Sequence, residues 1–114
     1  MFLSSKVSVK KIVKYRPDDA YSALLSAFKR SEICSLTSSD KTERTISAKT
    51  ESSWKTWGEK VTASVIPSGE KSSEITLTSS LKHGLFDWGK NQKNIDDILD
   101  LLSYTLEDYE KTEK

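Results

Sequence analysis

The chain has 114 residues, which is the length of one domain with one small core. Its 18 basic and 17 acidic residues leave a net charge of only +1, which argues against a general nucleic-acid binder, because such a protein needs an excess of Lys and Arg for phosphate contacts. No apolar run approaches the roughly 20 residues of a membrane span, and the amino terminus lacks the apolar segment of a signal peptide. We therefore expect a cytoplasmic protein with no nucleic-acid and no membrane partner.

The first predicted elements are a strand and a helix. Apolar and polar residues alternate early in 5–15, which predicts a half-buried strand. Pro17, followed by Asp18 and Asp19, favours a helix start, because proline fits the first turn and acids suit the positive end of the helix dipole. Apolar residues at helical spacing then predict a helix over 18–31.

Four strands and a second helix follow. The strands are predicted at 33–37, 44–50, 59–66 and 74–81, with turns at 38–41 and 67–70. A long apolar stripe predicts a helix over 88–110, and residues 111–114 are expected to fray. The order β-α-β-β-β-β-α predicts one α+β domain over residues 1–114: a two-layer structure, in which an antiparallel five-stranded sheet carries both helices on one face. The other face, rich in Ser, Thr and Lys, should be open to water.

Two short motifs contain all three tryptophans and two of the four glycines. Each places a Trp-Gly step beside charged residues at a border between elements. They supply the candidate site residues, which are Trp54, Trp57, Gly58, Glu59, Lys60, Asp87, Trp88, Gly89 and Lys90. The motifs form either a structural corner or a cleft in which aromatic and charged groups hold a small molecule or a peptide terminus.

These motifs, Trp57-Gly58-Glu59-Lys60 and the segment 87–91, resemble those of a group of short, uncharacterised bacterial proteins. The element order resembles the TATA-binding-protein-like (TBP-like) fold and is similar to a small version of the Bet v 1-like helix-grip domains. The resemblance implies a fold, and it gives no activity that could be transferred to this chain. DNA binding by the TATA-binding version uses apolar wedges on the sheet face, whereas the open face here carries Ser and Thr without an aromatic platform.

The sequence offers little for catalysis. His83 is the only histidine and lies in a Lys-His-Gly turn, and the only cysteine, Cys34, fits a small buried hydrophobe. The acids of the last helix, Asp96, Asp97 and Asp100, are expected to be ordinary solvated groups. We therefore expect no enzyme, no cofactor and no metal.

Charge is uneven along the chain. Residues 1–60 carry 12 basic and 7 acidic groups, and residues 61–114 carry 6 and 10. This asymmetry fits a protein partner or self-association, such as a weak homodimer, or simply a mixed solvated surface. For assembly, strands 59–81 have few lysines to guard against edge pairing, whereas Lys10, Lys11 and Lys14 guard the first strand.

The sequence leaves two functions open. The first is a non-catalytic binding or interaction domain of a small bacterial protein. The alternative is a carrier of a small apolar molecule in a cavity between the last helix and the sheet. The two functions differ in whether six large side chains fill the core or line a cavity. These side chains are Leu24, Phe28, Leu77, Trp88, Leu99 and Leu102. In a chain this short we expect them to fill the core.

Overall fold

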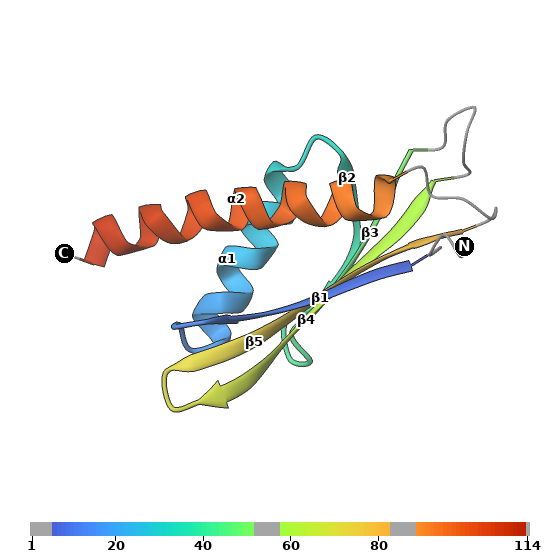
Figure 1. The fold of residues 1–114 in the computed structure, drawn as a ribbon. Coiled ribbons are helices and arrows are strands. Elements are labelled where there is room, and N and C mark those ends of the chain that lie inside the picture. Colours follow the sequence, from blue (N-terminus) through green and yellow to red (C-terminus); the bar gives the residue numbers. More distant parts are fainter. Residues whose placement is uncertain (1–5, 52–57, 83–88, 114) are drawn as a thin grey trace.

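The computed structural model describes residues 6–51, 58–82 and 89–113, with side chains through residue 107. The elements are, in chain order, β1 (Lys6–Val13), α1 (Pro17–Arg30), β2 (Cys34–Asp40), β3 (Thr45–Thr50), β4 (Glu59–Gly69), β5 (Ser72–Leu81) and α2 (Lys90–Glu113). Figure 1 shows both helices on one face of the sheet, with α2 crossing α1. The predicted α+β class and element order are confirmed.

The five strands form one antiparallel sheet in the order β1-β5-β4-β3-β2. The edges are therefore β1 and β2. The sequence left the identity of the edges open, and the strand with Lys10 and Lys11 is one of them. The expectation that residues 59–81 could pair with another chain is wrong, because β4 and β5 are central and both of their sides are already paired.

Both predicted turns lie a few residues earlier than the real ones. The β2–β3 turn begins after Asp40, whose Oδ1 accepts the backbone N–H groups of Thr42 and Glu43 at 3.0 Å each. Strand β4 continues through Pro67 to Gly69, because a register shift between these two residues lets the ladder accommodate a proline.

The core lies between the sheet and the two helices. Helix α1 contributes Tyr21, Leu24 and Phe28, and α2 contributes Ile95, Ile98 and Leu102, all of them buried. The alternating strands contribute the residues that the patterns predict to face inward, Ile46, Ala48, Val61, Ala63, Val65, Ile75 and Leu77.

Five of the six side chains that were expected to fill the core lie in the described residues, and all five are buried or half-buried there. Four are buried, Leu24, Phe28, Leu77 and Leu102, and Leu99 packs half-buried against them. Trp88 lies outside the described residues. Over the described part of the chain, the apolar space between helices and sheet is therefore filled.

A hydrogen-bonded link holds the α1–β2 connection against α2. The hydroxyl of Ser31 donates to Asp97 Oδ2 at 2.7 Å and accepts the backbone N–H groups of Ile33 and Cys34. Asp97 is half-buried, so the expectation of a freely solvated acid is wrong for this residue, although Asp96 and Asp100 are exposed. The link sets residues 32 and 33 opposite the first turns of α2.

Helix α2 begins at Lys90 and ends at Glu113, against a prediction of 88–110. None of the helices in the described ranges is both long enough and apolar enough to span a membrane.

Candidate functional site

Polar residues occupy core-facing positions at the end of the sheet nearest the start of α2. Glu59 precedes Val61, Ala63 and Val65 in the inward alternation of β4, and it is only 1% exposed. Two other strands and α2 contribute four more buried polar side chains, Thr50, Ser79, Asn91 and Asn94. Because these positions alternate with core residues, the backbone geometry places five polar groups inside the protein.

These five side chains form one hydrogen-bonded cluster, which we call the polar network. Glu59 Oε1 accepts from Thr50 Oγ1 at 3.0 Å and from Asn94 Nδ2 at 2.9 Å. Asn94 Nδ2 also donates to Ser79 Oγ at 3.1 Å, and Ser79 Oγ donates to Asn91 Oδ1 at 2.8 Å. Thr50 Oγ1 in turn accepts the backbone N–H of Glu59 at 2.9 Å.

The polar network is complete. In the part of the chain that the structure describes, every buried side-chain nitrogen and oxygen has a hydrogen-bond partner. A satisfied network of this kind holds its members in one arrangement, because breaking any link leaves a buried polar group unpaired. Glu59 and Asn94 are therefore fixed in position.

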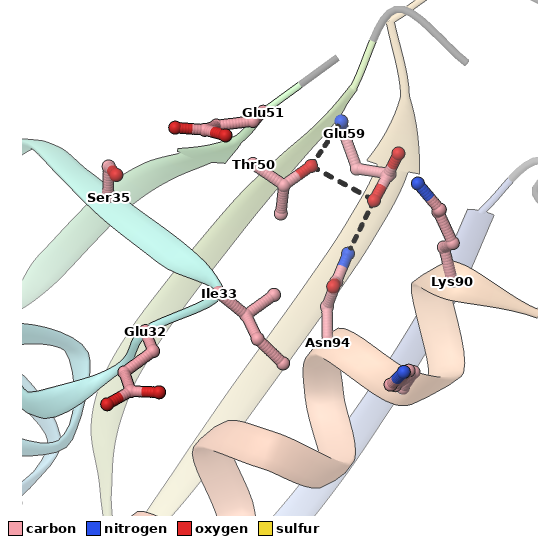
Figure 2. Close-up of a pocket in the computed structure, with 9 residues that line it drawn as sticks. Glu32, Ile33, Ser35, Thr50, Glu51, Glu59, Lys90 and Asn94 are labelled. Carbon is pink, nitrogen blue, oxygen red and sulfur yellow. Dashed lines mark hydrogen bonds between the residues drawn. The ribbon is translucent and has the colours of Figure 1, made fainter. Parts of the chain in front are cut away.

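A pocket of about 360 Å³ opens beside the polar network. Figure 2 shows Glu59, Thr50 and Asn94 on its inner side and Lys90 at the start of α2. The remaining lining residues come from α2 and from the β2 and β3 ends, and they are Lys93, Glu32, Ile33, Ser35 and Glu51. Of the nine lining residues that the structure describes, eight are polar or charged, so this part of the pocket suits a molecule with polar groups.

Cys34 lies close to this region without acting as a reactive group. The pKa of its thiol is raised to about 11, chiefly by burial. The hydrogen bond with Ser31 lowers this pKa by a smaller amount, and the negative charges of Asp97 and Glu59 raise it further. The thiol therefore stays protonated at neutral pH, and its predicted role as a small buried hydrophobe is confirmed by its 3% exposure.

The structure separates the candidate residues of the first motif. Glu59 points to the core side of β4, whereas its neighbour Lys60 is exposed on the opposite face. Gly58 has φ +92°, and a Cβ there would come within 2.6 Å of the carbonyl oxygen of Thr50. A close backbone approach thus explains the glycine, as the sequence suggests, and it brings Thr50 beside Glu59.

In the second motif, Gly89 has φ +77° and its carbonyl oxygen accepts the N–H of Lys93 at 3.2 Å, which begins α2. Lys90 follows at once and lines the pocket with Glu59. One residue from each motif is therefore in the same site. The other candidates, Trp54, Trp57, Asp87 and Trp88, lie outside the described residues, as does His83.

Four members of the polar network were not predicted from the sequence, and they are Thr50, Ser79, Asn91 and Asn94. The sequence signal for them is a polar residue at a position where the strand or helix period calls for an apolar one.

In the described ranges there is no group of three or more His, Cys, Asp or Glu side chains that could hold a metal ion.

The fold is similar to the folds of several solved structures. No protein-family model matches the sequence, and no curated protein matches it. Among solved structures, the chain is similar to the di-domain aromatase/cyclase BexL of the BE-7585A biosynthetic pathway, with a TM-score of 0.68 at 14% identity over 91% of this chain. It spans only 47% of the BexL chain.

Two further structures are similar over most of their own length. The protein TTHA0849 from Thermus thermophilus gives a TM-score of 0.58 at 12% identity, over 88% of this chain and 95% of that one. The Zhui aromatase/cyclase from Streptomyces sp. R1128 gives 0.54 at 10% identity, over 88% and 87%. Such identities show the fold alone, and they confirm the expected resemblance to helix-grip domains. The likeness to a group of short bacterial proteins stays a prediction.

These comparisons correct one expectation. The chain was expected not to be an enzyme, and that conclusion is wrong, because two of the solved structures with its fold are aromatase/cyclases. The missing catalytic motifs were therefore no ground for excluding catalysis. In such a fold, reacting groups can be single side chains around a pocket, with no characteristic spacing in the sequence.

Proposed function

We propose that this chain binds a small polar molecule in the pocket beside the polar network. The proposal follows the second function left open by the sequence, a small-molecule carrier with its site between the last helix and the sheet. The ligand's chemistry differs from that expectation, because the described apolar core is filled and eight of the nine described residues that line the pocket are polar or charged.

The observation that carries the proposal is the position of Glu59. Burying a carboxylate costs several kcal/mol before its hydrogen bonds offset the loss of water. Apolar residues at such a position are often as stable or more so, so stability alone gives little reason for an acid there. A buried acid that also lines a pocket is instead suited to a binding site, because small-molecule sites orient their ligand with a few fixed polar groups.

The pocket's size agrees with this function. Its volume of about 360 Å³ falls near the lower end of the roughly 300–1,000 Å³ of small-molecule sites. The polar network holds Asn94 and Thr50 in fixed positions at the pocket wall. A preorganised site of this kind loses little entropy when a ligand binds.

Chemical-shift mapping of the chain with a library of small polar fragments tests the proposal. We expect fragments to shift the backbone amides of Ile33, Thr50 and Asn94 and to leave the far turn at Glu70 unchanged. A Lys93→Trp variant should block the pocket and abolish the shifts. Asp96→Trp is the matched control, because it lies on the same helix, is exposed and lines no part of the pocket. Shifts that survive Lys93→Trp unchanged would contradict the proposal.

A second candidate function is acid–base catalysis on the bound molecule. It is favoured by Glu59, which is a carboxylate held rigidly at a pocket wall, as a general acid or base must be. With a fragment that the protein converts, Glu59→Gln should retain binding and lose conversion, followed by NMR of the small molecule. Conversion at an unchanged rate would exclude Glu59 from the reaction.

A further inference from the structure

The charges around the pocket are arranged by sign. Glu32 and Glu51 lie on the side formed by the β2 and β3 ends (Figure 2), whereas Lys90 and Lys93 lie on the first turn of α2. Over the described residues, Glu32, Glu51 and Lys93 form no ion pair with any other residue. The two sides therefore present opposite charges across one cavity, and at least these three charges are not neutralised by a neighbour.

The first turn of α2 adds a second asymmetry. Helices usually place acids there, because the helix dipole and the unpaired N–H groups favour negative charge. In α2 the first turn holds no acid and carries Lys90 and Lys93 instead. Both lysines line the pocket, so the lysine charge and the helix dipole favour an anionic group at the same wall.

The opposite wall has the converse preference. Glu32 and Glu51 are exposed carboxylates on the rim, and Glu59 lies deeper between the two walls. A ligand with only negative charge would meet three carboxylates, and a ligand with only positive charge would meet two ammonium groups. A ligand with both charges matches the two walls together.

We propose that the ligand is a small zwitterion of the amino-acid type, with its ammonium group towards Glu32 and Glu51 and its carboxylate towards Lys90 and Lys93. This inference rests on the proposed function and names its ligand class. Asn94, Thr50 and Ile33 lie between the walls and contact the uncharged middle of the molecule. Among the described residues that line the pocket, Ile33 is the only apolar one, so a short or polar side chain fits this part of the pocket better than a large apolar one.

Linear amino acids with increasing separation of the two charges are the probes: glycine, 3-aminopropanoate, 4-aminobutanoate and 5-aminopentanoate. Butanoate and butylammonium are the controls, each carrying one of the two charges. Titrations followed by NMR on the whole chain give the dissociation constants, with the amides of Ile33, Thr50 and Asn94 as reporters. We expect at least one zwitterion to bind ten-fold or more tightly than both controls. The separation of the two charges in the tightest-binding probe should match the distance between the two charged walls.

Exposed charge variants test the assignment of the walls. Lys93→Gln and Glu51→Gln should each weaken the best zwitterion at least three-fold. Lys29→Gln and Glu43→Gln are matched controls, exposed and outside the pocket, and should leave the affinity unchanged. Equal loss in the control variants would overturn the assignment, because the effect would then come from the overall charge.

The outcomes separate this inference from the proposed function. If uncharged or singly charged fragments shift the pocket amides and bind as well as every zwitterion, the zwitterion proposal fails and the binding function stands. If neither the zwitterions nor the fragment library shifts these amides, both fail.

Discussion

Replacing Asn94 with leucine should destabilise the protein through the polar network. The side-chain amide of Asn94 makes two buried hydrogen bonds, one to the Glu59 carboxylate at 2.9 Å and one to Ser79 Oγ at 3.1 Å. A bond to a charged group contributes about 1.5–3 kcal/mol and a neutral one about 0.5–1.5 kcal/mol. Leucine keeps the approximate volume and removes both, so we expect a loss of about 2–4 kcal/mol in the free energy of unfolding.

Urea unfolding at neutral pH measures this loss. Gln92→Leu is the matched control, because Gln92 is on the same helix and its bond to Asp96 is exposed; it should change stability by less than about 0.5 kcal/mol. A loss below about 1 kcal/mol for Asn94→Leu, with an unchanged dependence on urea, would refute the network as a stabilising unit.

The same reasoning predicts non-additivity. Glu59→Met alone leaves the donors of Thr50 and Asn94 without their acceptor. The double variant Glu59→Met, Asn94→Leu removes the charge together with one of its donors. It should therefore lose less stability than the two single changes combined, as measured in a double-mutant cycle.

Three shorter predictions follow from single residues. Gly58→Ala should destabilise the protein more than Gly89→Ala, because both have positive φ but only the first would bring a Cβ within 2.6 Å of a backbone oxygen; equal thermal shifts would contradict this. Asp40→Ala should cost about 1 kcal/mol in urea melts, since the β2–β3 turn loses two N–H acceptor contacts. The raised pKa of Cys34, about 11, means that the native state keeps a proton that the unfolded chain releases near pH 9. The Cys34 contribution to stability is thus fully present below pH 9 and lost as pH rises through about 11, and Cys34→Ala should lack this part of the alkaline loss.

Much of the fold could be predicted because the chain follows simple periods. The inward residues of β4 and β5 alternate strictly, and the stripe of α2 repeats at helical spacing, so element types and layers follow directly. Sheet order did not follow, since nothing local shows that β1 pairs with β5 and covers its free side. Pairing between residues far apart in sequence depends on the whole core, which the strand patterns alone do not specify.

Only part of the site could be predicted from the sequence, for a related reason. Glu59 and Lys90 were found through the Trp-Gly motifs, but they meet in one pocket only because the inner face of β4 lies opposite the start of α2. Asn94 and Ser79 lie at positions where the helix and strand periods place core residues, which indicates a buried polar cluster. The pocket itself could not be inferred, because it depends on where the Ser31–Asp97 hydrogen bond holds the α1–β2 connection.

The most direct test of the central claim is a crystal structure of the protein soaked with the best-binding polar fragment. The account predicts electron density in the pocket, with a polar atom of the fragment within hydrogen-bond distance of Glu59 or Asn94 and the polar network unchanged. A fragment that is bound only on the outer face of the sheet, while the pocket holds water alone, would contradict it.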